Sequence, residues 1–304
     1  MFYVGIDGGG GSTRFAIINE DNEVIGQLTL EKGINYHLYG IESVYETIKE
    51  GINKLLEKVD VNLKDVKGIG ASVSGVDSSR PKDVEIFKNI FSKIANFEKM
   101  AISNDAIGAL WGATEDGNGI ILINGTGSII YGKNGDRIER FGGWGYLLDD
   151  EGGGYWIATE GVKKILHFRD GLIEKPSFYD EILKYFNIDD PSSFVYIYYQ
   201  EFSKRRIAGA AKIVIDAASK GDKVAIEIIE RGLRWCTKGI KLLAQRLDMI
   251  EKPTITYSGG LFKSQYYKTV FSNILFEAFE QFELIEPKHS AAVGAALMVL
   301  NESK

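Results

Sequence analysis

The first stretch that could do chemistry is Asp7 with the glycines Gly8–Gly11 and the hydroxyl pair Ser12–Thr13. Apolar runs flank it, Tyr3–Ile6 before and Phe15–Ile18 after, and predict a β-hairpin with an open tip. Because glycine lacks Cβ, N–H groups of the tip can approach an anion closely, and the hydroxyls add donors. Asp7 at the strand end could hold a cation through water. A hairpin without a ligand is the alternative, but successive glycines would then only weaken it.

A second tip of the same kind follows about a hundred residues later. The strand Gly119–Ile123 leads into Asn124 and Gly125–Ser128, and the strand Ile129–Tyr131 follows. Asn124 stands where Asp7 stands in the first hairpin. Two such tips predict two related lobes that grip one phosphate chain from opposite sides. The chain contains no GxxxxGK[ST] loop, and no helix directly follows the first glycines, so neither common phosphate loop is present.

Asp105 is the candidate general base. It follows the short strand Lys99–Ser103, where a helix is expected to begin at Ala106. A carboxylate fixed at a helix start could accept the proton of a hydroxyl nucleophile in phosphoryl transfer. An aspartate in such a place often only caps the helix. Here Asn104 could serve as the cap, which would leave the Asp105 carboxylate free.

A loop of acids and glycines forms another candidate site. Asp149, Asp150 and Glu151 lie between Gly143-Trp144-Gly145 and Gly152–Gly154. Clustered acids on a loop are commonly solvated, but the tryptophan and the glycines favour a tight, shaped turn. A buried acceptor in such a turn would select ligands by their hydroxyl groups.

The elements that must position these residues alternate between strands and helices. Buried-looking strands followed by amphipathic helices predict a mostly parallel sheet, in which ligands bind at the carboxyl ends of the strands. Asp7, Gly75 and Asp105 lie at such ends, whereas Glu31–Gly40 is expected to be a loop. The later expected elements are helix Val224–Leu247, strand Thr254–Tyr257, helix Gln265–Phe282, strand Glu283–Glu286 and helix Ala291–Leu300.

Length and composition narrow the class of protein. A chain of 304 residues favours two domains, and its net charge of −6 argues against nucleic acid or an anionic membrane as the main partner. The one cysteine excludes an internal disulfide and a cysteine-built metal cluster. The sequence shows no signal peptide, and no apolar run is long enough to span a membrane. Together these features predict a cytoplasmic protein, with a homodimer left open.

In these residues the chain resembles the sugar-kinase branch of the actin/hsp70/hexokinase superfamily, and most of all its N-acetylglucosamine kinase and BadF/BadG/BcrA/BcrD ATPase group. The resemblance runs from end to end and rests on motifs that occur in the expected order. They are Asp7–Thr13, Val73–Val76, Asn104–Ala106, Gly125–Ser128, Gly143–Gly145 with Asp150–Gly152, Ser258–Gly260 and Gly294–Ala296.

The resemblance implies an α/β fold of two lobes, the actin-like ATPase (ribonuclease H-like) fold. Each lobe would be a mixed sheet flanked by helices, with ATP and sugar in the cleft between the lobes. The expected N-terminal lobe is 1–113, joined by the C-terminal helix 289–304, and the expected C-terminal lobe is 114–288. The implied activity is Mg²⁺-dependent transfer of phosphate from ATP to the 6-hydroxyl of a hexosamine, either N-acetylglucosamine or glucosamine, with glucose as a further option.

The resemblance also assigns roles to residues. Asp105 would be catalytic, and Asp7 would hold Mg²⁺ through water. The nucleotide would be bound by Gly9, Gly10, Gly11, Ser12, Thr13, Gly125, Thr126, Gly127, Ser258, Gly259 and Gly260. The sugar would be bound by Asn35, Tyr36, His37, Ser74, Asn104, Gly143, Trp144, Gly145 and Asp150. Asp149 departs from the Gly or Ser that is more common there in relatives, and this puts the shape of the sugar pocket in question.

Three other functions compete with this interpretation. A BadF-type ATPase that passes electrons from an iron–sulfur cluster needs cysteine ligands at a subunit interface, and Cys236 lies in the middle of an expected helix. A ROK-type kinase would carry a cysteine-rich zinc motif, which the chain lacks. A non-catalytic, ATP-dependent sugar sensor would keep the ligand sites, and only the presence of Asp105 argues against it.

Overall fold

The computed structural model describes residues 1–76 and 80–301, and its elements divide between two compact units. The first unit comprises residues 1–119, 133–135 and 285–304, and the second comprises residues 120–132 and 136–284. The bounds expected from the sequence, 1–113 with 289–304 and 114–288, stay a prediction. Residues 302–304 of the expected C-terminal helix lie outside the described residues.

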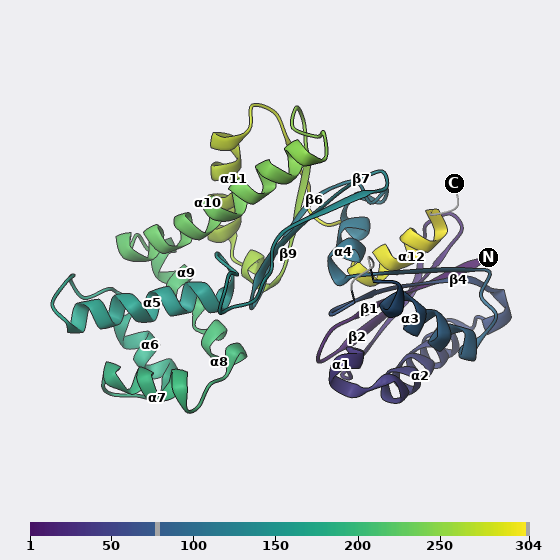
Figure 1. The fold of residues 1–304 in the computed structure, drawn as a ribbon, viewed down its shortest axis with the longest axis horizontal. Helices are drawn as coiled ribbons and strands as arrows, with labels where there is room; N and C mark the ends of the chain where they lie inside the picture. The colour runs from purple at the N-terminus through teal and green to yellow at the C-terminus, as the bar shows by residue number, and fades with distance from the viewer. Residues whose placement is uncertain (77–79, 302–304) are drawn as a thin grey trace. The chain divides into compact units, whose positions relative to one another are not determined.

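The first unit is built on a mixed sheet of five strands in the order β3-β2-β1-β4-β5 (Figure 1). Strands β1, β2 and β3 are antiparallel neighbours, whereas β1, β4 and β5 run parallel. The strands are β1 Phe2–Gly8, β2 Thr13–Asn19, β3 Val24–Leu30, β4 Val66–Val73 and β5 Lys99–Ser103. The helices are α1 Tyr36–Tyr39, α2 Ile41–Val59, η1 Leu63–Asp65, α3 Pro81–Ile94, α4 Asp105–Thr114 and α12 Ala291–Asn301.

Helix α12 lies very close to the first sheet because glycines line the contact. A Cβ at Gly5 of β1 would overlap the Ala292 carbonyl oxygen, and a Cβ at Gly70 of β4 would overlap that of Ala295. A Cβ at Gly294 of α12 would in turn overlap the backbone of α4. Backbone atoms cannot move aside as a flexible side chain can, so only glycine fits at these positions. This contact joins the C-terminal helix to a sheet formed from the N-terminal part of the chain.

The other face of the first sheet packs on an aliphatic and aromatic core. Phe15 and Ile17 of β2 and Ile69 of β4 are fully buried there with Phe87 of α3 and Ile48 of α2. Helix α2 is amphipathic, and its buried residues recur at spacings of three and four along the helix. The core therefore fixes the strand ends on which the candidate residues lie.

The second unit has its own five-stranded sheet in the order β10-β9-β6-β7-β8, with β9 parallel to both β6 and β10 (Figure 1). Its strands are β6 Gly119–Asn124, β7 Ser128–Asn134, β8 Arg137–Gly142, β9 Thr254–Ser258 and β10 Glu283–Leu284. Its helices are α5 Gly154–Arg169, α6 Tyr179–Phe186, η2 Pro191–Ser193, α7 Phe194–Tyr199, α8 Lys204–Gly209, α9 Ala211–Ser219, α10 Lys223–Arg246, η3 Gly260–Lys263 and α11 Gln265–Ala278.

Most expected elements are present, and three differ. The segment expected to be a loop contains the short helix α1, because Asn35 caps it by accepting a hydrogen bond from the His37 N–H at 3.0 Å. Helix α11 ends at Ala278 rather than at Phe282, because Phe279 is extended, with φ −126° and ψ 138°. Strand β10 is shorter than expected and pairs with β9 only through Glu283 and Leu284.

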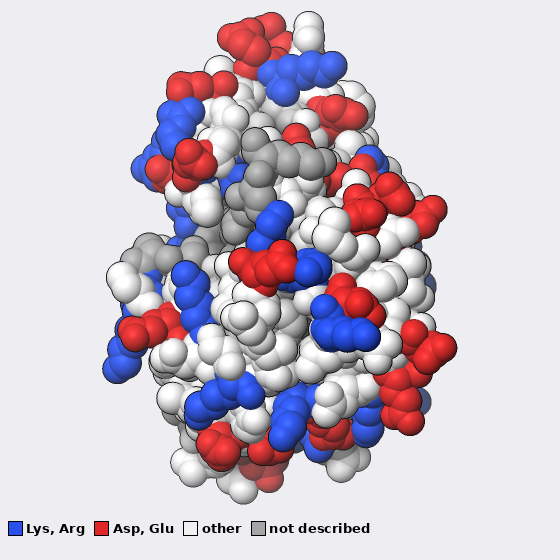
Figure 2. All heavy atoms as spheres, turned by 90° about the vertical axis from the view of Figure 1, so that its right-hand side faces the viewer, with Lys and Arg blue, Asp and Glu red and all other residues white. Residues whose placement is uncertain are grey.

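The charged side chains do not gather into one large patch on the face drawn in Figure 2, where acidic and basic groups of the described residues alternate. This agrees with the small net charge of −6. None of the described helices combines the length and apolarity that crossing a membrane requires. On the face drawn in Figure 2, the described residues therefore form no broad electropositive area of the kind that binds nucleic acid.

The glycine contact under α12 predicts a large loss of stability on substitution. Gly70→Ala should lower the free energy of unfolding by about 2–4 kcal/mol, because the added methyl would overlap a backbone carbonyl. Gly11→Ala is the matched control, since nothing lies within 4 Å of its Cβ position. Chemical denaturation followed by circular dichroism measures both. Equal stability of the two variants would contradict the packing described here.

Candidate functional site

The candidate residues of the first unit lie at the carboxyl edge of its parallel strands. In the register of the sheet, Asp7 is opposite Ser72, and Ser72 is opposite Ser103. The chain leaves β4 at Ser74, whose N–H donates to the Gly8 carbonyl oxygen at 2.8 Å. The ends of β1, β4 and β5 are therefore adjacent, as expected for a ligand site on such a sheet.

Asn104 is the N-cap of helix α4, as the sequence predicted. Its Oδ1 accepts a hydrogen bond from the Ile107 N–H at 3.1 Å, and its side chain is buried. The Asp105 side chain is reached by solvent. Because the neighbouring asparagine satisfies the helix terminus, the Asp105 carboxylate is available for another task.

The carboxylates of Asp7 and Asp105 influence one another. Close packing raises the pKa of Asp105, and the negative charge of Asp7 raises it further, although the N–H groups of Ala106 and Asp105 itself oppose this. Burial also raises the pKa of Asp7 and outweighs the Arg14 guanidinium, which lies 3.0 Å from Asp7 Oδ2. A raised pKa makes a carboxylate a better proton acceptor near neutral pH.

The first glycine tip leaves open space above its backbone. A Cβ at Gly11 would meet no atom within 4 Å, and one at Gly10 would meet only Leu38 Cδ1 at 3.8 Å. Neither glycine has a φ in the left-handed region, so the backbone does not require glycine at these two positions. A ligand that approaches the backbone closely would require it. By contrast, a Cβ at Gly8 would overlap Ile34, so Gly8 serves the fold.

The tip is fastened to the loop that follows β3. The Gly9 carbonyl accepts the Ile34 N–H at 3.2 Å, and the Tyr39 hydroxyl donates to the Gly10 carbonyl. Thr13 is fully buried and donates to the Lys32 carbonyl oxygen at 2.7 Å. The Thr13 hydroxyl thus holds the loop, and the direct role expected for it toward the nucleotide stays a prediction.

The segment expected to bind sugar joins the same edge. A Cβ at Gly75 would lie 2.7 Å from Asn35 Nδ2, and Gly75 has a φ of 86° that favours glycine. Tyr36 donates to Asp83 Oδ1 of α3 at 2.6 Å, and this hydrogen bond raises the pKa of Tyr36 to about 12. His37 is exposed, with its ring 4.0 Å from that of Tyr36. Asp83 had no assigned role, although an acid three residues into a helix that begins with proline is a visible signal.

In the second unit, the second glycine tip lies on the start of helix α5. The Gly125 carbonyl accepts the Gly154 N–H at 2.8 Å, and the Thr126 carbonyl accepts the Tyr155 N–H at 2.9 Å. A Cβ at Gly125 would meet nothing within 4 Å. This tip therefore also combines a fastened backbone with open space.

The Ser258–Gly260 segment, also predicted to bind the nucleotide, adjoins this tip. Ser258 at the end of β9 pairs with Ile123 of β6. Gly259 has a φ of 106°, and a Cβ there would overlap the Asn124 carbonyl. Gly260 has open space at its Cβ position. Two of the three predicted nucleotide segments are therefore in backbone contact.

The Asp150 carboxylate lies against Gly127 of the second tip. Asp150 is 4% exposed, and a Cβ at Gly127 would overlap its carboxylate. Its Oδ2 lies 3.5 Å from Lys204 Nζ, a partner that the sequence analysis missed and no sequence signal marked. Trp144 is 68% exposed and stacks on the Arg140 guanidinium at 4.0 Å. The sugar contacts expected of Asp150 and of Gly143–Gly145 stay predictions.

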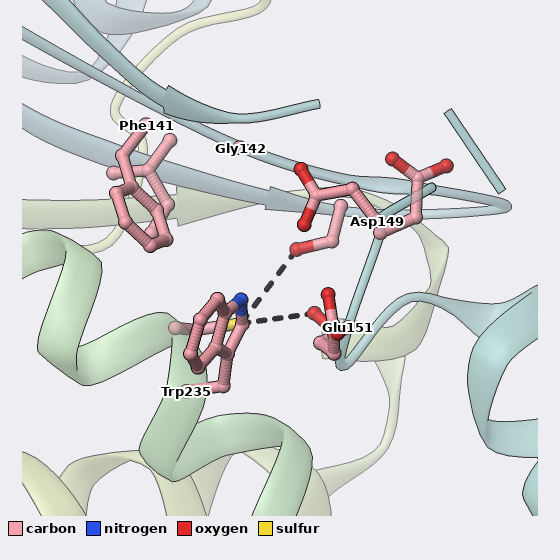
Figure 3. A pocket seen from close by; sticks show the side chains of 9 residues that line it. Phe141, Gly142, Asp149, Glu151 and Trp235 are labelled. Carbon is pink, nitrogen blue, oxygen red and sulfur yellow. Dashed lines mark hydrogen bonds between the residues drawn. The ribbon is translucent and has the colours of Figure 1, made fainter. Parts of the chain in front are cut away.

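Asp149 shapes the loop that contains Trp144. Its Oδ2 accepts the Trp144 N–H at 3.2 Å, and it lines a small pocket with Phe141, Glu151 and Trp235 (Figure 3). Burial and the neighbouring Asp149 raise the pKa of Glu151. The residue that departs from the common pattern therefore holds the Gly143–Gly145 segment through a hydrogen bond.

The comparisons with known proteins identify the family. A family model described as the BadF/BadG/BcrA/BcrD ATPase family matches residues 4–299. The chain belongs to this family. It is 31% identical, over 99% of each chain, to the N-acetylmuramic acid/N-acetylglucosamine kinase of Clostridium acetobutylicum. It is 27% identical to the N-acetyl-D-glucosamine kinase of Dictyostelium discoideum, over 99% of this chain and 98% of that one.

Solved structures confirm the predicted fold. A candidate N-acetylglucosamine kinase from Chromobacterium violaceum has a TM-score of 0.75 at 22% identity, with 99% of each chain covered. The ROK hexokinase of Thermus thermophilus has a TM-score of 0.61 at 16% identity, with 100% of this chain and 99% of that one covered. The fold of this family member is therefore the actin-like ATPase fold with two mixed sheets.

The described residues fit the nucleotide of an ATPase. The open space above Gly10, Gly11 and Gly125 suits phosphate oxygens, and bound Mg²⁺ would neutralise their charge. No three described side chains of the metal-binding types gather into a cage. Mg²⁺ commonly keeps several waters and binds through one or two carboxylates, and the role expected of Asp7 toward this ion stays a prediction.

The open tip predicts a specific effect of a bulky residue. Gly10→Val should weaken ATP binding at least about tenfold, or ~1.4 kcal/mol, because the side chain would fill the space above the tip. Folding should persist, since the nearest atom is a flexible leucine methyl at 3.8 Å. Calorimetric titration with ATP and thermal unfolding measure the two effects. The control is Asp21→Val in the exposed β2–β3 turn, and wild-type affinity in Gly10→Val would make the tip purely structural.

The raised pKa of Asp105 predicts a pH-dependent stability difference. A carboxyl whose folded-state pKa exceeds its usual value of 3.8 destabilises the protein progressively as pH rises from that value to the folded-state pKa. Asp105→Asn removes this effect, so the variant should be more stable than the wild type at pH 7. The difference should vanish below the usual pKa, where both states are protonated. Thermal unfolding at pH 7, 5 and 3.5 tests this, and a variant less stable at pH 7 would refute the raised pKa of Asp105.

Proposed function

We propose that this family member is an ATP- and Mg²⁺-dependent kinase that phosphorylates the 6-hydroxyl of a hexosamine. The position and environment of Asp105 are the observation that carries the proposal. Its carboxylate lies at the carboxyl edge of the parallel strands, and it need not cap helix α4 because Asn104 does so. Desolvation and the negative charge of Asp7 raise its pKa. A proton acceptor in this place serves a hydroxyl nucleophile, whereas binding ATP alone would not require one.

The relatives support the choice of acceptor. The two relatives that match over nearly the whole of each chain are named N-acetyl-D-glucosamine kinase and N-acetylmuramic acid/N-acetylglucosamine kinase. A glucosamine kinase of Vibrio cholerae is 25% identical over 76% of each chain. On this proposal the sugar is N-acetylglucosamine or glucosamine. N-acetylmuramic acid belongs in the same panel because of the relative from Clostridium acetobutylicum.

The residues then take the following roles. Asp105 accepts the proton of the sugar hydroxyl, and Asp7 holds Mg²⁺ through water. The nucleotide is bound by Gly9–Thr13, Gly125–Gly127 and Ser258–Gly260. The sugar is bound by Asn35–His37, Ser74, Asn104, Gly143–Gly145 and Asp150. In phosphoryl transfer such groups act mainly by positioning the reactants and balancing charge.

Two alternatives predict no sugar phosphate. A BadF-type ATPase would hydrolyse ATP without a sugar, and a sensor would bind ATP and sugar without turnover. A coupled assay of ADP release with N-acetylglucosamine, glucosamine, glucose and N-acetylmuramic acid separates these functions. ADP release that depends on one sugar supports the kinase. Release without any sugar favours the ATPase, and binding without release favours the sensor.

Replacing the base gives the sharpest kinetic test. Asp105→Asn keeps the size of the side chain but removes the proton acceptor, so kcat should fall by roughly 100- to 10,000-fold. The affinity for ATP should change little, because the nucleotide residues are untouched. Steady-state kinetics on the best sugar and calorimetry with ATP measure both. A variant that keeps more than about a tenth of wild-type kcat would place the base elsewhere.

A further inference from the structure

One buried hydroxyl joins three segments of the second unit. Tyr267 of helix α11 is fully buried. Its hydroxyl accepts a hydrogen bond from Asn124 Nδ2 at 2.8 Å and donates one to the Gly152 carbonyl oxygen at 2.9 Å. Asn124 immediately precedes the second glycine tip, Gly152 belongs to the acidic loop, and α11 follows the Ser258–Gly260 segment.

Other hydrogen bonds and packing contacts near this hydroxyl connect the same segments. The Cys236 thiol donates to the Glu151 carbonyl at 3.4 Å and lies 3.6 Å from the Ser128 hydroxyl, at the other end of the tip (Figure 3). The Tyr267 N–H bonds to Ser264, the cap of α11, and its ring contacts Phe262 edge-on. The thiol contacts are longer and weaker than those of the Tyr267 hydroxyl.

The Asn124 side chain depends on Tyr267 for its orientation. Asn124 is fully buried, and its Oδ1 has no hydrogen-bond partner within the described part of the chain. Among the described residues, its Nδ2 has only the tyrosine hydroxyl at 2.8 Å and the thiol sulfur at 3.8 Å as partners. Without the hydroxyl the amide would be nearly unsatisfied, and a buried unsatisfied amide drives rearrangement of its backbone.

We propose that Tyr267 is a positioning residue of the nucleotide site, whose hydroxyl sets the register of the second glycine tip against the acidic loop and the Ser258–Gly260 segment. This rests on the nucleotide-binding role proposed above for Gly125–Gly127 and Ser258–Gly260. The hydroxyl remains a donor throughout the working pH range, because burial raises the pKa of Tyr267 well above its usual value.

The distinguishing variant is Tyr267→Phe, which retains the ring and its packing and removes only the hydroxyl. The dissociation constant for ADP and the KM for ATP should rise about 5- to 30-fold, because two buried partners lose their hydrogen bond. A role in stability alone would leave nucleotide affinity unchanged in the folded variant.

Tyr198→Phe is the matched control. Its hydroxyl lies 3.1 Å from the Thr159 hydroxyl, and its ring packs against the same core. Loss of this hydroxyl should leave ADP affinity within about twofold of wild type. Calorimetry with ADP and the ADP-induced rise in melting temperature are measured for both variants. Wild-type ADP affinity in folded Tyr267→Phe, or an equal loss in Tyr198→Phe, would overturn the proposal.

A second variant keeps the test decisive if Tyr267→Phe fails to fold. Asn124→Ala removes the donor to the same hydroxyl and should weaken ADP binding at least about fivefold. Where both single variants fold, the losses in the double variant should be less than additive, because both changes break one network. Wild-type affinity in Asn124→Ala, or full additivity, would refute the role of Tyr267. Because ADP binding is measured without a sugar, failure of the kinase assay leaves this result interpretable.

Discussion

The close contact between helix α12 and the first sheet is the constraint on which the candidate site of the first unit depends. Gly5 and Gly70 let the helix backbone lie almost directly on β1 and β4, and Gly294 lets α4 approach α12 in turn. Helix α4 begins at Asp105, so this stack of backbones determines where that carboxylate stands relative to the ends of the strands. Rigid elements hold a functional group more accurately than loops do.

Electrostatics then gives the edge its chemical character. Desolvation by the surrounding protein atoms raises the pKa values of Asp7 and Asp105, and the negative charge of Asp7 raises that of Asp105 further. Ionising both carboxylates at this edge therefore costs free energy. Arg14 offsets part of this cost for Asp7. Groups with perturbed pKa values concentrate at functional sites, and here the perturbation has a stated cause in burial and a like charge.

The two glycine tips achieve a similar result by different means. The first is fastened through the loop after β3, by Ile34 and Tyr39. The second is fastened through helix α5 and through a buried polar network around Asn124 and Tyr267. In both, backbone carbonyls are bonded within the protein while space remains above the glycines. A tip fixed before the ligand arrives loses little conformational entropy on binding.

The sequence by itself determined the family, the two glycine tips, the parallel strand ends and the Asn104 cap. The family follows from a resemblance along the whole chain, whereas the tips, strand ends and cap follow from local rules, because strand alternation, glycine runs and cap residues act over a few positions. Only the tertiary structure decided that Asp150 faces Gly127 and Lys204, and that Tyr267 joins Asn124 to Gly152. Those contacts connect residues 23 to 143 positions apart, read from 127 to 150 and from 124 to 267, and no local pattern encodes them. The packing of whole helices and strands determines such partners. A buried tyrosine whose hydroxyl positions other segments therefore cannot be distinguished in the sequence from one that only fills the core.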